Sequence, residues 1–367
     1  MTPTTRLDVL IVYTSEFATS ARSPGAYAPF MPESHRTNYN TAYAYMLETC
    51  RRQGIRAGLA VTDDIVGPGK CRAFWTFNKS WKRIDAPCFA PLIFDKCSPK
   101  TAAMKRKRGI LFSARSKPFN DDSLYSIFFD KQKTYNVLAP YTIPTVTVKN
   151  SDKVTVDKAI EMLTGLIDRH ASREDFAPRF VLKDRFGAGG DNIFIVDNNL
   201  QQIQSILQRH PDVSFILQPF LMFDRGYQYK ANAGSTDIRL IYLGQNVIQT
   251  YVRIAAPEEF RCNEHKGGSL IYTRKNEIPA KVLRFADHVA AKLTSQNNLY
   301  ALDFIVSNNG NIYLIEGNSG PGVDWNLSKP HNERKAKLLI RHIVAEFKNR
   351  LRPRSRKAVH SYSSLQS

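Results

Sequence analysis

The sequence predicts a mixed α/β and α+β fold, and three observations lead to this prediction. Short apolar runs and a helical pattern alternate over residues 1–116, which is typical of a small α/β domain with a mainly parallel sheet. The character changes at Lys117, where longer helical and extended segments begin. Further on, residues 238–243, 247–254 and 299–318 have the pattern of strands in an antiparallel sheet.

The first region contains several predicted strands and one clear helix. Apolar residues at helical spacing end before Gly54, and they are Tyr39, Ala42, Tyr43, Met46, Leu47 and Cys50. The predicted strands are 7–13, 55–61, 73–77, 89–94 and 110–112. The basic run 105–108 has two interpretations, a solvated loop or a docking point for phosphate or an acidic partner.

The second region alternates helices and strands. The predicted helices are 121–138, a helix capped by Ser151 or Asp152, one around Ile203 and Leu207, and two with apolar faces over 282–293 and 338–347. The predicted extended segments are 143–148, 179–183, 192–196 and 215–221. Residues 351–367 are basic and then serine-rich, which predicts a flexible tail.

The bulk composition favours a cytoplasmic globular protein. The chain has 367 residues, of which 43% are hydrophobic and 23% charged, so it can form two or three ordinary domains. No apolar run reaches the ~20 residues that cross a bilayer, and the first residues lack a signal-peptide core. Five cysteines without CxxC spacing indicate a reducing compartment, and the net charge of +19 favours acidic partners.

The segment 299–318 carries the most informative pattern. Asn309-Gly310 is the preferred dipeptide of a two-residue type I′ turn, and counting outward from a pair between Asn308 and Asn311 places Asp303 opposite Glu316. Asn318 lies two residues beyond Glu316, and strand alternation brings it to the same face. Paired carboxylates repel each other, so the pattern predicts a magnesium or manganese site. The alternative is a surface hairpin with solvated acids.

A glycine-rich segment joins two predicted strands. Gly187, Gly189 and Gly190 allow backbone amides to approach a phosphate closely, and Lys183 adds a positive charge at the strand end. We interpret the segment as a phosphate cradle. It is neither a P-loop nor a Rossmann fingerprint, because no helix follows, and a plain turn is the alternative.

Two arginines lie on neighbouring predicted strands. Arg239 and Arg253 could together hold a carboxylate or a transferring phosphoryl group. Each arginine alone has the alternative of an ordinary surface residue, but a second glycine pair, Gly267-Gly268, follows them.

Taken in order, these motifs resemble those of the ATP-grasp superfamily over residues 117–345, particularly the carboxylate–amine ligases that include the ribosomal-protein glutamate ligase and bacterial glutathione synthetases. The motifs are Asp130-Lys131, 181–183 with 187–190, 218–221, 237–239, 260–263 with 267–268, and Asp303 with 316–318. The resemblance implies a pre-ATP-grasp domain over 1–116, ATP-grasp lobes over 117–216 and 217–350, and the tail 351–367.

The resemblance also implies roles for individual residues. Lys131 and Lys183 contact ATP phosphates, with Gly187, Gly189 and Gly190 closing over them. The segment 218–221, with Gln218, Phe220 and Leu221, lines the adenine pocket, and Asp224 is the implied ribose ligand. Asp303, Glu316 and Asn318 hold two magnesium ions, with manganese as the alternative metal. Arg253 and Asn263 lie near the transferred phosphoryl group, and Arg239 positions the substrate or supports Arg253.

The function expected from these features is ATP-dependent ligation of a carboxylate to an amine through an acyl phosphate, with release of ADP and phosphate. The expected substrates are small molecules or peptides, and the positive charge favours acidic ones. One alternative is a nucleic-acid-binding protein that uses the run 105–108 and the segment 352–357, although aromatic residues are not interleaved there. The other is an inactive ATP-binding regulator, against which Asp303, Glu316 and Asn318 argue. The sequence leaves open whether the chain forms a homo-oligomer.

Overall fold

The computed structural model of the protein describes residues 3–97, 102–187, 189–230, 232, 234–293 and 297–352. Most of the predicted tail, from residue 353 on, lies outside the described residues. Strands in the described part form four sheets. None of the described helices has the length and apolar character needed to cross a membrane.

The first sheet has the order β10-β9-β2-β3-β6-β7 and is parallel from β10 to β3, whereas β6 and β7 are antiparallel. Its strands are β2 (Val9–Tyr13), β3 (Ala57–Val61), β6 (Phe74–Asn78), β7 (Ser80–Ile84), β9 (Leu92–Lys96) and β10 (Lys117–Pro118). The predicted strands near residues 7, 55, 73 and 89 are therefore confirmed within a few residues. The predicted strand 110–112 is wrong, because Ile110 ends a helix, α2 (Ala102–Ile110).

A small second sheet lies beside the first, with the order β1-β8-β5-β4. Its strands are β1 (Thr5–Arg6), β4 (Ile65–Gly67), β5 (Lys70–Cys71) and β8 (Cys88–Phe89). Short 3-10 helices connect elements along the chain: η1 (Pro32–Ser34), η2 (Thr62–Asp64), η3 (Ala139–Tyr141), η4 (Arg173–Asp175), η5 (Glu264–Lys266) and η6 (Lys275–Glu277).

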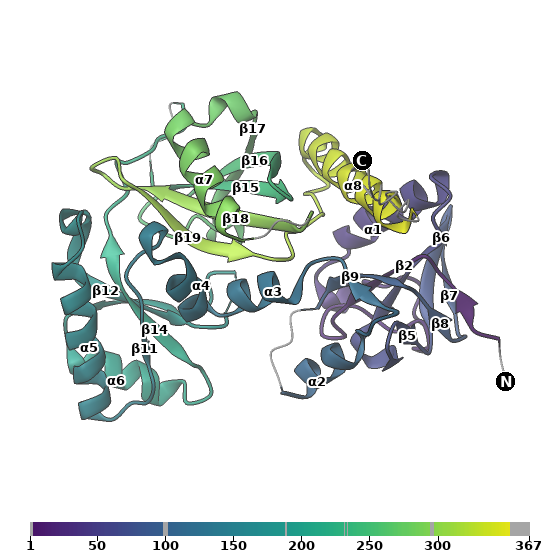
Figure 1. Ribbon diagram of the computed structural model, residues 1–367, viewed down its shortest axis with the longest axis horizontal. Coiled ribbons are helices and arrows are strands. Elements are labelled where there is room, and N and C mark those ends of the chain that lie inside the picture. Colours follow the sequence, from purple (N-terminus) through teal and green to yellow (C-terminus); the bar gives the residue numbers. More distant parts are fainter. Residues whose placement is uncertain are drawn as a thin grey trace, which may run out of the picture.

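Helices from both ends of the described chain cover the first sheet. The predicted helix near residue 39 is α1 (Asn38–Arg52), and it packs beside α8 (Pro330–Leu351) (Figure 1). Met46 of α1 and Phe347 of α8 belong to the same buried cluster as Ile11 and Leu59 of the sheet. The last helix of the described chain thus completes the core of the first region.

The third sheet has the order β11-β14-β12-β13 and carries two helices. Its strands are β11 (Val146–Val148), β12 (Phe176–Asp184), β13 (Ile193–Asp197) and β14 (Phe215–Leu221), and its helices are α5 (Lys153–Asp168) and α6 (Leu200–Arg209). Asp152 caps α5, as one of the two predicted residues, by accepting a hydrogen bond from the backbone N–H of Thr155.

The fourth sheet is antiparallel, as predicted, with the order β17-β16-β15-β18-β19. Its strands are β15 (Thr236–Leu243), β16 (Asn246–Ile254), β17 (Ser269–Thr273), β18 (Leu299–Val306) and β19 (Ile312–Asn318). Helix α7 (Ala280–Leu293) packs its apolar residues, among them Val282 and Val289, against one face of this sheet.

The predicted single helix 121–138 is wrong, because two helices occupy this segment. They are α3 (Asp122–Phe129) and α4 (Lys131–Leu138), and Asp130 between them has extended backbone angles. Its carboxylate accepts hydrogen bonds from the backbone N–H groups of Gln132 and Lys133, so Asp130 starts a new helix instead of continuing the old one. Helix α3 lies between the two halves of the molecule (Figure 1).

The turn of the β18–β19 hairpin differs from the prediction, although the predicted opposition of Asp303 and Glu316 is confirmed. The backbone N–H of Ser307 bonds to the carbonyl of Asn311, so three residues form the loop, and Gly310 has a left-handed φ of 87°. A β-bulge between Asp303 and Phe304 then shifts the pairing by one residue. The longer loop and the bulge shift the register by one residue in opposite directions, so Asp303 still lies opposite Glu316.

A buried carboxylate fixes this turn to the neighbouring sheet. Asp175 is fully buried just before β12, and its side chain accepts hydrogen bonds from Asn309, Asn311 and Tyr313 at 2.7 to 2.9 Å. Burial opposes ionisation of Asp175, but these hydrogen bonds outweigh burial and lower the pKa of its carboxyl group. Asp175 therefore ties the β18–β19 turn to the third sheet.

We predict that Asp175→Ala lowers the free energy of unfolding by about 3 kcal/mol, because three donors lose a charged acceptor. Denaturation in urea measures this loss. The loss should be full near neutral pH and shrink as pH falls below 3.8, the ordinary pKa, because the lowered native pKa stabilises the fold only where the carboxylate is ionised. Asp224→Ala is the control, since its side chain is 66% exposed, and an equal loss in both variants would contradict the assignment.

Candidate active site

A cleft lies between the third and fourth sheets. Its empty volume is about 940 Å³, counting the space open to solvent. One part of the wall is apolar and the other carries charges. The apolar residues include Ile143, Val181, Ile193, Phe220, Leu221, Phe223, Ile305 and Ile315, and the charged residues include Lys131, Lys183, Asp237, Arg253, Asp303 and Glu316.

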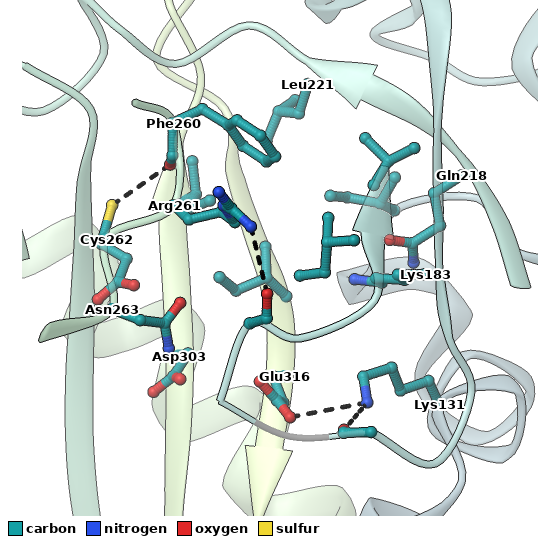
Figure 2. A pocket seen from close by; sticks show the side chains of 18 of the residues that line it. Lys131, Lys183, Gln218, Leu221, Phe260, Arg261, Cys262, Asn263, Asp303 and Glu316 are labelled. Atoms are coloured by element: carbon teal, nitrogen blue, oxygen red, sulfur yellow. Dashed lines mark hydrogen bonds and ion pairs between the residues drawn. The ribbon is translucent and has the colours of Figure 1, made fainter. Parts of the chain in front are cut away.

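Two lysines reach the charged part from different elements. Lys131 is the first residue of α4, and Lys183 lies on β12. Figure 2 shows Lys131 pointing toward Glu316, and their charged atoms are 3.9 Å apart. Lys131 Nζ also donates a hydrogen bond to the carbonyl of Gly187. Burial, together with the charge of Lys131, lowers the pKa of Lys183 to about 8.

The glycine-rich segment closes one side of the cleft. Gly187, Gly189 and Gly190 all line it, and the last two have positive φ angles of 77° and 83°. Arg261 donates a hydrogen bond to the carbonyl of Gly190, and a Cβ at that position would lie 3.1 Å from Asn263 Oδ1 (Figure 2). Side chains from the segment after β16 therefore meet the glycine-rich segment across the cleft.

The acidic pair lies on the opposite wall. Asp303 and Glu316 lie opposite each other on β18 and β19, and both line the cleft. Asp303 is only 2% exposed, so the alternative of a solvated surface hairpin is wrong for this residue.

Two arginines hold Asp303 within a buried ion network. Arg239 donates to its two oxygens, each at 2.5 Å, and Arg253 donates to Oδ2 at 2.7 Å. Arg253 also forms a bidentate pair with Asp237, with both distances 2.8 Å. Burial opposes the charge of Asp303, but the two arginines outweigh burial and lower the pKa of its carboxyl group.

The network leaves one end of Arg253 available. Its Nε and Nη2 atoms bind Asp237 and Asp303, whereas Nη1 makes no hydrogen bond to any part of the chain that the structure describes. Because Arg253 lines the cleft, this end can bind an anion there. No role was predicted for Asp237 itself. Counting outward from the Leu243–Asn246 pair would not have found it, because a bulge shifts the register before Arg253.

Three predicted site residues do not line the cleft. Arg239 reaches it only through Asp303, and its Nη1 donates to the hydroxyl of Tyr251. Asn318 pairs with Ala301 at the end of β19, and its side-chain oxygen accepts from the backbone N–H of Gly320. Asp224, the expected ribose ligand, lies on the exposed surface, where its carboxylate accepts a hydrogen bond from Asn308 of the hairpin turn.

The cleft wall also contains residues without a predicted role. Arg261 and Cys262 line it beside the predicted Asn263, within the motif 260–263. Arg261 forms a bidentate pair with Glu259, and burial raises the pKa of the Cys262 thiol. Their position in a motif of the resembled family was the signal that could have identified them.

The acidic pair fits a divalent cation that is shared with a phosphate ligand. Among the residues that the structure describes, no three acidic, histidine or cysteine side chains gather closely enough to bind a metal alone. Magnesium is commonly bound by one or two carboxylates together with phosphate oxygens and water, and Asp303 and Glu316 supply such a partial set.

Comparison with known proteins assigns the family. Residues 129–343, more than half of the chain, match the model of the RimK-like ATP-grasp domain. The chain therefore belongs to the RimK-like ATP-grasp family, and its mixed two-lobed fold is the fold of that family.

Individual proteins show the same similarity. A probable alpha-L-glutamate ligase of Histophilus somni is 30% identical over 172 residues, which is 46% of this chain and 51% of that protein. This chain thus spans about half the length of the curated relatives it matches. A RiPP-associated ATP-grasp ligase of Chryseobacterium gregarium, solved with ADP and a leader and core peptide, aligns with a TM-score of 0.55 and 14% identity over 95% of this chain and 98% of that chain. The ATP-grasp ligase PsnB, solved with Mg, ADP and a precursor variant, aligns with a TM-score of 0.51 and 12% identity over 94% of this chain and 100% of that chain.

We predict that Asp237→Asn lowers the free energy of unfolding by about 3 kcal/mol, because it leaves the buried Arg253 charge without its main partner. Urea denaturation measures the change. The double variant Asp237→Asn with Arg253→Gln should lose clearly less than the sum of the two single losses. Additive losses would contradict a direct coupling of the two residues.

A second prediction concerns the pH dependence of nucleotide binding. Lys183 has a pKa of about 8 in the free protein. Above that pH the side chain is mostly neutral, so it must take up a proton before it can bind a phosphate as a cation. The dissociation constant for MgADP should therefore rise as pH increases above 8, by up to about tenfold per pH unit. Calorimetry measures this rise, and Lys183→Arg should show a flatter profile. Identical profiles would contradict the role of Lys183.

Proposed function

We propose that this protein is an ATP-dependent carboxylate–amine ligase that forms an amide or peptide bond. The observation that carries the proposal is the cleft itself, where Lys131 and Lys183 face the Asp303–Glu316 pair and Arg253 lies beside Asp303. Membership of the RimK-like ATP-grasp family supports the proposal.

The two parts of the cleft suit the two parts of ATP. The apolar wall, with Phe220, Leu221 and Phe223, suits a purine base, and the buried Gln218 lies at its edge. Lys131, Lys183 and the glycine-rich segment suit the phosphates, because they combine positive charge with a backbone that carries no side chains. The bound ADP in the Chryseobacterium gregarium enzyme agrees with this use of the fold.

Asp303 and Glu316 are the residues that would hold magnesium, with Asn318 close to them at the end of β19. When bound, magnesium supplies positive charge that neutralises the phosphate oxygens. The presence of Mg with ADP in the PsnB structure supports this choice of metal. The number of ions, which we expect to be two, and manganese as the alternative are parts of the proposal.

The proposed reaction has two steps. A carboxylate oxygen of one substrate attacks the γ-phosphorus of ATP, the bond to the β-phosphate breaks, and ADP leaves. The amine of the second substrate then attacks the acyl carbon, gives up a proton, and displaces phosphate. Arg253 Nη1 and Asn263 are the groups we assign to the transferred phosphoryl group, and Arg239 is assigned to hold Asp303 and Arg253 in place. Burial by the glycine-rich segment protects the acyl phosphate from water.

The substrate classes follow from charge and from the relatives. The net charge of +19 favours acidic carboxylates or acidic peptides as substrates. Relatives named as glutamate ligases and a neighbour with bound peptides agree with amino acid or peptide substrates. We place the activity in the cytoplasm, since all five cysteines are buried and free.

The test is release of ADP and phosphate from MgATP with pooled carboxylates, amines and acidic peptides. Wild-type protein should release both only when a carboxylate and an amine are present together. A heavy-oxygen label in the substrate carboxylate should appear in the phosphate, because the acyl phosphate passes one oxygen to it. Folded protein that binds MgATP but transfers no label with any pool would be an inactive regulator, contrary to the proposal.

We predict that Glu316→Gln lowers kcat/KM about a hundred- to thousandfold, because the site loses a carboxylate for magnesium. Thermal unfolding should confirm that the variant is folded. Asp224→Asn is the matched control, since Asp224 lies outside the cleft, and it should keep wild-type activity. Equal losses in both variants would contradict the assignment of the cleft as the active site.

A further inference from the structure

Helix α2 carries the basic run 105–108 and lies outside the part of the chain that matches the ATP-grasp domain. Two of its cations have partners within the chain. Lys107 pairs with Asp63 at 2.6 Å, and Arg108 pairs with Asp95 at 2.6 Å and lies 3.7 Å from the ring centre of Tyr125. The predicted solvated loop is therefore a helix whose charges are partly used internally.

Lys105 points toward the glycine-rich segment. Its Nζ lies 5.1 Å from the ring centre of Phe129 and 5.3 Å from that of Phe186. Both distances fall within the range of cation–π attraction. Phe129 ends α3, and Phe186 directly precedes Gly187, so one lysine contacts two separate elements of the ATP-grasp domain.

The two rings also stack on each other. The Phe186 and Phe129 ring centres are 5.4 Å apart with an interplanar angle of 28°, and Phe129 stacks on Tyr125 at 5.4 Å and 20°. Phe186 is nevertheless 39% exposed. We call Lys105, Tyr125, Phe129 and Phe186 the aromatic stack. The aromatic stack holds Phe186, which lies in the short segment between β12 and β13 and is not buried by these strands.

The residues beside Phe186 are bonded to Lys131 of the cleft. The carbonyl of Arg185 accepts from the Lys131 backbone N–H at 3.2 Å, and the carbonyl of Gly187 accepts from Lys131 Nζ. Arg185 also forms a bidentate pair with Asp130, with both distances 2.6 Å. The backbone on both sides of Phe186 is therefore hydrogen-bonded to Lys131.

We propose that Phe186 is a positioning residue for nucleotide binding, and that Lys105 and Phe129 hold it so that α2, outside the ATP-grasp domain, helps to orient Lys131. Only the identity of the ligand rests on the proposed function, because the placement of Phe186 is a physical property of the fold.

Two variants test the stack without changing the segment it holds. Phe129→Ala and Lys105→Gln leave the sequence around the trypsin site at Arg185–Phe186 unchanged. The rate of trypsin cleavage at this peptide bond, followed by mass spectrometry, therefore reports local opening of the segment around Phe186. Loss of the ring should speed this cleavage about three- to tenfold, and loss of the cation about two- to fivefold. Arg106→Gln is the matched control on the same helix, since Arg106 has no ion pair or ring contact among the described residues, and its cleavage should match wild type.

Nucleotide binding gives the second readout. Phe129→Ala should raise the dissociation constant for MgADP by about three- to tenfold while the temperature of global unfolding stays within about 2 °C of wild type. Phe186→Tyr keeps a stacking ring and should bind MgADP with wild-type affinity. Phe186→Ala lacks the ring and should bind MgADP more weakly.

The two readouts separate this inference from the proposed function. Unchanged cleavage at Arg185 in Phe129→Ala would overturn the stack even if the enzyme is a ligase. Faster cleavage with unchanged MgADP affinity would overturn the link to Lys131. If wild type binds no MgADP, the proposed function fails and the positioning role for nucleotide fails with it, while faster cleavage would still support the stack as a physical contact.

Discussion

The site depends on a buried network of two aspartates and two arginines. Asp303 is buried, so its ionised carboxylate needs cationic partners, and these are Arg239 and Arg253. Asp237 in turn balances the charge of Arg253. The four charges sum to zero, so the network can be buried in the free protein. It also fixes the direction of Arg253, because two of its three nitrogen atoms are already engaged. The charged part of the cleft is therefore preorganised before a ligand arrives.

The preorganisation extends to the hairpins that carry these residues. Both the β15–β16 and the β18–β19 hairpins contain a bulge close to the network, between Ile241 and Tyr242 and between Asp303 and Phe304. A bulge redirects the side chains that follow it, and such features are common beside active sites. The network thus depends on irregular pairing, and a perfectly regular sheet would place these side chains on other faces.

Much of this could be predicted from the sequence, and the failures have clear physical causes. Periodicity located most strands and helices, and the order of motifs identified the family. The opposition of Asp303 and Glu316 was predicted correctly, but through two errors that cancel, since neither the three-residue loop nor the bulge is visible in a count from Asn309-Gly310. Asp130 interrupts a continuous helical pattern because its carboxylate caps the N-terminus of α4 and forms an ion pair with Arg185. The place of Asp224 outside the cleft could not be predicted, because its carboxylate bonds to Asn308 in the hairpin turn of a distant segment.

The packing of α8 has a consequence for how the protein is made. The sheet that begins at Val9 buries one face partly against Ile340, Val344 and Phe347, which belong to the last helix of the described chain. During synthesis the ribosome releases these residues more than three hundred positions after the first strand. The core of the first sheet therefore cannot form completely until α8 has been synthesised, and the sheet stays partly uncovered until then.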